Sequence, residues 1–383
     1  MVAPSGMRFS VDPWDPSYGV SLDPVEGQSK QDIDVALELP PERWRPLDPE
    51  PGVAPPAAVL FVDGVRRVDA QAWVHDPDGQ EAAPALYASY AAGVVCCCAR
   101  DGAHVASYQV ERRLVTTAEG ALDVATRAGR YRAVVIAAKA NQPPGQALSQ
   151  KVQGLLNEVE VQAAGRAREQ LSVSDDLLVV DGPLRGRDRL PRAVGYVKTH
   201  HTPYLKEAPA AHRVVAALGP RQRTPLFTMT TPGSNLRRYS WYLRLTCPPG
   251  APWAGIVRLE CNGQLALADA VALARRSQIT LDRFASTGYK DSRAPQNLYP
   301  IAGLERDLRR RLGDAGVLYR ALRTAASRPE DTAASRPEDT AASRPGDTTA
   351  GRSVDPAADH GVARVASLPD RRPVGPTLAD LAG

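Results

Sequence analysis

The pattern of hydrophobic and polar positions predicts strands early in the central part of the chain and a mixture of helices and strands later. Stretches without helical spacing predict strands at 58–62, 66–74, 86–98, 105–115, 177–180, 193–197 and 255–260. Residues 131–138 fit either a strand or the start of a helix. Apolar residues three and four apart predict helices over 146–170, 266–276 and 301–312. This order favours an α/β fold, a mixed β-sheet flanked by helices.

The two ends of the chain differ from this body, residues 58–323. Residues 1–57 form an acidic, proline-rich extension whose aromatic residues suggest packing on the body or on a partner; these are Trp14, Tyr18 and Trp44. In the tail, residues 324–383, an octapeptide occurs at 324–331 and 332–339 and, with one change, at 340–347. Its Pro, Ser and paired charges cannot bury apolar surface, so we expect a disordered low-complexity tail.

Charge is distributed unevenly along the 383 residues. Residues 1–57 carry 4 basic and 10 acidic side chains, and residues 324–383 carry 7 and 9. Residues 58–323 therefore carry 36 basic and 24 acidic side chains, a net charge of +12. A basic body favours a polyanionic partner such as nucleic acid, because neutralising phosphates releases counterions. Ordinary solubility is the alternative explanation.

Cysteine usage and hydropathy bear on the compartment. Cys96, Cys97 and Cys98 lie in an apolar run and are typical of buried strand residues. The five cysteines include no C-x-x-C pair, so the spacing suggests neither a zinc site nor a redox pair. The odd count favours a reducing compartment, and no apolar run approaches the roughly 18 residues of a membrane span. We expect a cytoplasmic protein that does not contact membranes.

Two predicted strands end in the same way. Leu60-Phe61-Val62-Asp63-Gly64 and Leu178-Val179-Val180-Asp181-Gly182 each place a carboxylate just after a buried strand, beside a glycine that permits a tight turn. If the strands are neighbours, Asp63 and Asp181 meet, and clustered carboxylates are stabilised by Mg²⁺ or Mn²⁺. The alternative is that each Asp-Gly pair is simply a turn signal.

Two further polar blocks are candidates for a site. In the first, a strand leads into Lys198, Thr199, His200 and His201. Lys198 could hold a phosphate and Thr199 or His200 could help to position one; the alternative is an ordinary solvated strand end. The second, residues 289–300, is a dense polar and aromatic loop containing Asp291 before a predicted helix that carries Glu305. Glu305 can also be explained as an acid near the helix N-terminus that complements the helix dipole.

The ordered set of these motifs resembles the NurA family of DNA-end-processing nucleases. The resemblance spans roughly residues 58–314 and is carried by four motifs: Val62-Asp63-Gly64 with Arg66, Val180-Asp181-Gly182-Pro183-Leu184, Gly195-Tyr196-Val197-Lys198, and Tyr299-Pro300. It implies an RNase H-like core, a homodimer, manganese-dependent nuclease activity on DNA, and partnership with the hexameric ATPase HerA.

The resemblance also implies roles for single residues. Asp63 and Asp181 match metal ligands, and the family places a glutamate on the helix before Asp181, where Glu160 fits the spacing better than Glu158. The chain departs from the family in having Glu305 where many relatives have histidine, and Asn297 where they have an aromatic residue. Either Glu305 or Asp291 is the candidate for the last ligand.

The resulting hypothesis is phosphodiester hydrolysis in DNA with Mn²⁺ or Mg²⁺ as cofactor. Asp63, Glu160 and Asp181 would hold the metal, and Lys198 would stabilise the charge that develops on the phosphate. Arg66, Arg185 and Arg187 would contact the DNA backbone without reading its sequence. The alternatives are a non-catalytic NurA-like adaptor that binds DNA or the ATPase, and a ribonuclease with the same core chemistry.

Overall fold

The computed structural model describes residues 31–75, 82–138, 141–172, 174–187, 189–199, 204–230, 236–247, 253–289 and 293–327, all within one compact unit. Its strands are β1 (Asp32–Asp34), β2 (Ala58–His75), β3 (Ala82–Cys98), β4 (Gly102–Thr116), β5 (Val124–Thr126), β6 (Gly129–Val135), β7 (Asp176–Asp181), β8 (Ala193–Val197), β9 (Phe227–Thr230), β10 (Arg237–Arg244) and β11 (Ile256–Asn262). Its α-helices are α1 (Pro144–Leu171), α2 (Pro209–Ala216), α3 (Leu267–Leu281), α4 (Tyr299–Arg311) and α5 (Ala315–Ala326).

All the described strands belong to one mixed sheet. Their order is β1-β9-β10-β11-β8-β7-β2-β3-β4-β6-β5. Strands β2, β3 and β4 form an antiparallel meander, whereas β7 runs parallel to β2 and β8 runs parallel to β7. Strands β2 and β7 therefore run in the same direction at the centre of the sheet, which is where the predicted carboxylates lie. Asp181 ends β7 as expected, but Asp63 lies within β2, which continues to His75, so the prediction that Asp63 follows the end of a strand is wrong.

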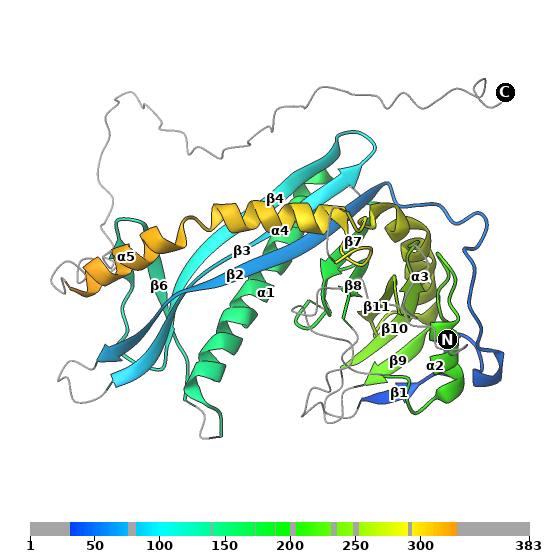
Figure 1. Ribbon diagram of the computed structural model, residues 1–383, viewed down its shortest axis with the longest axis horizontal. Coiled ribbons are helices and arrows are strands. Elements are labelled where there is room, and N and C mark those ends of the chain that lie inside the picture. The colour runs from blue at the N-terminus through cyan, green and yellow to red at the C-terminus, as the bar shows by residue number, and fades with distance from the viewer. Residues whose placement is uncertain are drawn as a thin grey trace, which may run out of the picture. The chain divides into compact units, whose positions relative to one another are not determined.

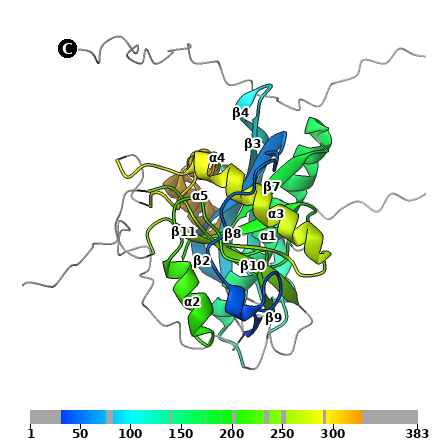
Figure 2. The same ribbon diagram turned by 90° about the vertical axis from the view of Figure 1, so that its right-hand side faces the viewer.

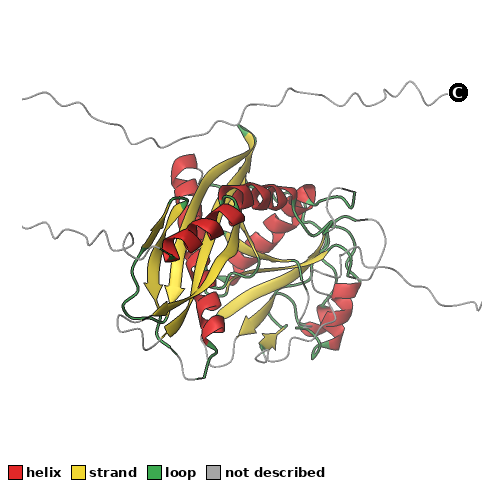
Figure 3. Ribbon diagram, turned by 60° about the vertical axis from the view of Figure 1, so that its left-hand side comes forward, coloured by secondary structure: helices red, strands yellow, loops and turns green. Residues whose placement is uncertain are grey.

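Helices cover both faces of the sheet (Figure 3). Alternate residues of a strand point to opposite faces, and β3 shows this clearly: Tyr90 and Ala92 pack in a cluster with α1, whereas Ala91 and Val95 pack with α4. Helices α1 and α4 thus sandwich the meander (Figure 1). Helix α3 packs on β10 and β11 (Figure 2).

This architecture confirms the predicted α/β fold, a mixed sheet flanked by helices. The stretches 58–62 and 66–74 are parts of one long strand, β2, and residues 129–135 form a strand rather than the start of a helix. Helix α5 continues to Ala326, so it includes the first three residues of the repeat that was assigned to the tail. In the described part of the chain, no helix combines the length and the apolar character needed to cross a bilayer.

The described part of the N-terminal extension packs on the body. Trp44 is buried beside Phe227 and donates its indole N–H to the Val35 carbonyl, at 2.8 Å. Glu38 accepts two hydrogen bonds from Arg223, at 2.7 and 2.8 Å. The expectation that the aromatic residues pack on the body therefore holds for Trp44; Trp14 and Tyr18 lie outside the described residues.

Candidate functional site

Asp63 and Asp181 lie on neighbouring parallel strands. Val62 of β2 is in register with Val180 of β7, and each aspartate is the next residue along its strand. Since alternate residues share a face, both aspartates lie on the face that buries Phe61 and Val179. The charge of Asp181 raises the pKa of Asp63, after the larger effect of burial. The two Asp-Gly motifs therefore meet, as the sequence predicts for adjacent strands.

Glu160 approaches β2 from helix α1, on the face of the sheet opposite to Asp63. Its Oε1 lies 2.6 Å from the position that a Cβ on residue 64 would occupy, so a larger residue at position 64 would have to displace the carboxylate. The charge of Glu160 contributes to the raised pKa of Asp63. Burial, together with the charge of Asp181, raises the pKa of Glu160 to about 7 despite the opposing effect of Arg187. Glu158 is exposed, so Glu160 is the helical glutamate that faces the cluster.

Lys198 completes the group of side chains predicted to be catalytic. It follows β8, and its Nζ lies 2.9 Å from Asp181 Oδ2 and donates a second hydrogen bond, also of 2.9 Å, to Asn297 Oδ1. The lysine charge lowers the pKa of Asp63. Asn297 is fully buried just before α4, so it fixes the ammonium group beside the carboxylates.

Arg187 is buried against Glu160. Its Nε lies 2.5 Å from Glu160 Oε2, and its other nitrogens donate to Asn157 Oδ1 at 2.9 Å and to the Pro183 carbonyl at 3.1 Å. With 6% of its surface exposed, Arg187 has little area to offer to a DNA phosphate. Its contacts position Glu160 and the turn after β7 instead.

Glu260 of β11 is a neighbouring residue that the sequence did not single out. It is buried, its Oε1 accepts a 2.7 Å hydrogen bond from the Leu184 amide, and its Oε2 accepts one of 2.6 Å from Arg258. Arg258 and Arg238 keep the pKa of Glu260 below its ordinary value, against the effect of burial. This charged pair supports the turn that follows Asp181. A signal was present in the sequence, because two charged residues interrupt the apolar strand Ile256–Asn262.

The donor set at the cluster suits a hard divalent cation. Asp63, Glu160 and Asp181 offer only carboxylate oxygens, the ligands that Mg²⁺ and Mn²⁺ prefer. Burial, and after it the repulsion from neighbouring carboxylates, raises the pKa values of Asp63 and Glu160, and a bound cation would offset both effects. The donor chemistry therefore fits Mg²⁺ or Mn²⁺. The ligand atoms of these three described carboxylates do not all lie within 4.8 Å of one another, so the side chains would have to move closer to share one ion.

Glu305 and Asp291 were the candidates for a last ligand. Glu305 accepts hydrogen bonds from Arg293 at 3.2 Å and from Arg309 at 2.8 Å, and these arginines lower its pKa against the effect of burial. It is not in the first turn of α4, which begins at Tyr299, so the explanation through the helix dipole is wrong. Asp291 lies outside the described residues.

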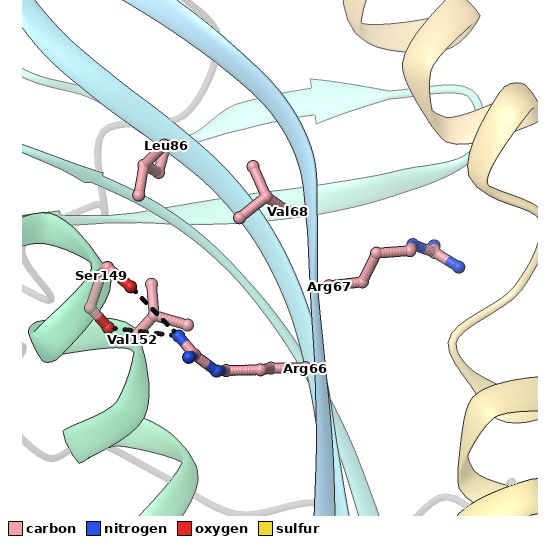
Figure 4. A pocket seen from close by; sticks show the side chains of 6 residues that line it. All are labelled: Arg66, Arg67, Val68, Leu86, Ser149 and Val152. Carbon is pink, nitrogen blue, oxygen red and sulfur yellow. Dashed lines mark hydrogen bonds between the residues drawn. The ribbon is translucent and has the colours of Figure 1, made fainter. Parts of the chain in front are cut away.

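The remaining predicted DNA contacts are dispersed. Arg66 is exposed, points toward α1 and donates to Ser149 Oγ at 3.2 Å, whereas Arg67 points the other way (Figure 4). Both arginines line a pocket of about 320 Å³. Arg185 is exposed in the turn after β7, and His200 lies outside the described residues.

Comparison with protein-family models finds no match, and comparison with curated proteins finds none either. What the site can do must therefore be inferred from its geometry and chemistry.

Proposed function

We propose that the protein is a divalent-metal-dependent DNA nuclease of the NurA type. The observation that carries this proposal is the convergence of Asp63, Asp181 and Glu160 from two strands and a helix, with Lys198 bonded to one of them. Charged groups are rarely buried together without a purpose, because each loses hydration energy. Metal-assisted phosphodiester hydrolysis needs several oxygen donors around one ion. The three carboxylates influence one another's pKa values, and they would have to draw together to hold that ion, because their ligand atoms do not all lie within 4.8 Å of one another.

The topology at the centre of the sheet supports the proposed RNase H-like core. Three antiparallel strands, β2 to β4, are followed by the short strands β5 and β6, by helix α1, and then by β7 and β8, which lie parallel to the first strand on its other side. In this core, the first strand and the strand after the helix supply Asp63 and Asp181, and the helix supplies Glu160.

Each side chain of the cluster has a distinct proposed role. Asp63, Glu160 and Asp181 would hold Mn²⁺ or Mg²⁺. The bound metal would polarise the phosphate and lower the pKa of the attacking water. Lys198, held by Asn297, places a positive charge where negative charge develops on the phosphate. Arg187 keeps Glu160 in place.

The partners in this proposal come from the charge distribution and from the family resemblance. The net charge of +12 over residues 58–323 favours attraction to DNA, with exposed Arg66 and Arg185 as backbone contacts. The ordered motifs support a homodimer that works beside a HerA-like ATPase in DNA-end processing.

Cleavage of end-labelled linear DNA by the purified full chain tests the activity. We expect cleavage with Mn²⁺ or Mg²⁺ and none with excess chelator. Asp181→Asn should lower the rate by roughly two or more orders of magnitude, because it removes a ligand charge. Asp269→Asn is the matched control, since Asp269 is exposed at the start of α3. Full activity in Asp181→Asn would overturn the assignment, and preference for RNA of the same sequence would favour the ribonuclease.

A non-catalytic adaptor is the second candidate, and one observation favours it. Lys198 and Arg187 already pair with Asp181 and Glu160, so the cluster could be a buried ion-pair network with no metal. Thermal unfolding with and without Mn²⁺ separates the two. An enzyme should gain stability from Mn²⁺ through Asp63 and Asp181, whereas an adaptor should show no such gain and yet bind DNA.

A further inference from the structure

A second group of metal-binding side chains lies at the tip of the β3–β4 hairpin, which is the cyan loop at the top of Figure 1. Cys96 and Cys98 are two residues apart on β3 and so share a face, and His104 of β4 is in register with Cys96. The ligand atoms of these three side chains all lie within 4.8 Å of one another. This group could not be predicted from the sequence, because the histidine comes from the opposite strand and no C-x-x-C pair is present.

The hairpin turn brings the three side chains together. Cys98 is in register with Gly102, so only Ala99, Arg100 and Asp101 separate the paired residues. Gly102 adopts φ +64°, which suits the last position of a tight hairpin loop. The Asp101 amide donates to Cys98 Sγ at 3.4 Å, and amides directed at sulfur stabilise a thiolate.

Two features distinguish this group from ordinary core cysteines. His104 Nδ1 is buried and has no hydrogen-bond partner among the described residues, and such a burial costs free energy that a metal bond would offset. The Cys96 side chain is fully buried, yet it lies against Cys98 and His104 and not against apolar groups alone. Cys97, between the two cysteines, points to the opposite face.

We propose that Cys96, Cys98 and His104 bind one Zn²⁺ ion that links β3 to β4. Two thiolates and one imidazole are a soft to borderline donor set that suits Zn²⁺ and disfavours Mn²⁺ and Mg²⁺. Tetrahedral zinc, with bonds of about 2.3 Å to sulfur and 2.0 Å to nitrogen, separates its ligands by roughly 3.5–3.8 Å. The ligand atoms, at most 4.8 Å apart, thus need to close by about 1.3 Å at most.

Binding releases the protons of the thiols, and each sulfur that loses its proton forms one bond to the zinc. Zinc affinity should fall as the pH falls, because protons compete with the metal for the two sulfurs and the imidazole nitrogen. The fourth position is open to water or to the Asp101 carboxylate, which now pairs with exposed Arg100 at 2.8 Å. The site lies on the opposite face of the sheet from Asp63, since Cys96 pairs with Leu60 and packs in the α1-side cluster.

Cobalt substitution in the full chain tests this proposal. Co²⁺ should produce a thiolate-to-metal charge-transfer band and tetrahedral visible bands, and one equivalent of Zn²⁺ should abolish both. Cys98→Ser and His104→Gln should weaken binding by more than the roughly 10–100-fold that loss of an outer-shell partner costs. Cys97→Ala is the matched control and should bind normally. These variants avoid Cys96, whose full burial makes substitution there a risk to folding.

The readout is independent of nuclease activity. An Asp63→Asn/Asp181→Asn variant should keep the cobalt spectrum. Loss of metal binding at the carboxylates can therefore be distinguished from loss of metal binding at the hairpin. Absence of a charge-transfer band in the unmodified chain would overturn the proposal. So would a band that survives both Cys98→Ser and His104→Gln or that disappears in Cys97→Ala.

Discussion

At Glu160, opposing effects decide the charge of the carboxyl group. Burial raises its pKa, the charge of Arg187 lowers it and the charge of Asp181 raises it again. The loss of hydration outweighs the single arginine, and the pKa reaches about 7. Without a cation, the cluster therefore keeps protons near neutral pH that a metal would have to displace.

The raised pKa of Glu160 predicts how stability depends on pH in chelator. The folded protein holds the Glu160 proton up to about pH 7, whereas the unfolded chain releases it near 4.5. The folded state therefore binds more protons in this window, and the free energy of unfolding should fall as the pH rises through it. The free energy of unfolding, measured with urea, should therefore be lower at pH 8 than at pH 5. In Glu160→Gln this difference should be about 1–3 kcal/mol smaller than in the unmodified protein. An unchanged difference between the two pH values would contradict the assigned shift.

Gly64 predicts a steric effect at the same carboxylate. A Cβ at this position would lie 2.6 Å from Glu160 Oε1 and 2.7 Å from Leu156 Cδ1. Gly64→Ala should therefore lower the free energy of unfolding by about 1–3 kcal/mol and raise the Mn²⁺ concentration needed for cleavage. Denaturant titration and metal titration check the two effects.

Gly154→Ala on α1 is the control for Gly64→Ala, because nothing lies within 4 Å of its added Cβ. This variant should be neutral or up to about 1 kcal/mol more stable, since alanine favours the helix. Equal effects of the two variants would show that the crowding at Gly64 is unimportant.

Among the elements, those with a strong local pattern could be predicted from the sequence. The long helix α1 and strands β3, β4, β7 and β8 have clear periodicity or apolar runs, and the Asp-Gly pairs mark where β7 ends and where β2 carries its buried carboxylate. Strands β9 and β10 were missed. Strand β9 has only four residues. Strand β10 is buried on both faces, with Trp241 and Tyr242 in different core clusters, so apolar and polar residues do not alternate along it. Helix α2 has only eight residues.

The supporting residues of the site could not be predicted, for a different reason. Asn297 bonds to Lys198 across 99 residues, and Glu260 bonds to the Leu184 amide across 76. Such contacts depend on how β8, β11 and α4 assemble, and no local spacing encodes them. The pairing of Asp63 with Asp181 was predictable because each Asp-Gly motif is local, although Asp63 lies within β2 and not at its end.

Helix α4 yields a prediction about the last metal ligand. Glu305 is held by Arg293 before the helix and by Arg309 one turn further along it. Glu305→Gln should therefore cost only about 0–1 kcal/mol of stability and leave the Mn²⁺ dependence of cleavage unchanged. Metal titration of the cleavage rate measures this. A clear rise in the Mn²⁺ requirement would instead make Glu305 a ligand.

For the whole molecule, helix α5 determines how far the chain must extend toward the C-terminus for stable folding. Leu318 and Leu322 of α5 pack with Leu114 and Tyr131, so the helix covers part of the core. A chain ending at residue 327 should unfold at the same temperature as the full chain and cleave DNA at the same rate. A chain ending at residue 314 should lose several kcal/mol, because it exposes that cluster. Thermal unfolding of both truncations tests this, and a large loss on ending at 327 would show that the tail contributes to the fold.

The central claim is that Asp63, Glu160 and Asp181 together hold a hard divalent cation. A crystal structure of the full chain grown with Mn²⁺, with anomalous diffraction collected at the manganese edge, tests this claim most directly. We predict an anomalous peak bounded by oxygens of all three carboxylates, with Lys198 still beside Asp181 and no peak in Asp63→Asn/Asp181→Asn crystals. Manganese bound elsewhere, with Lys198 and Arg187 alone neutralising the carboxylates, would contradict the claim.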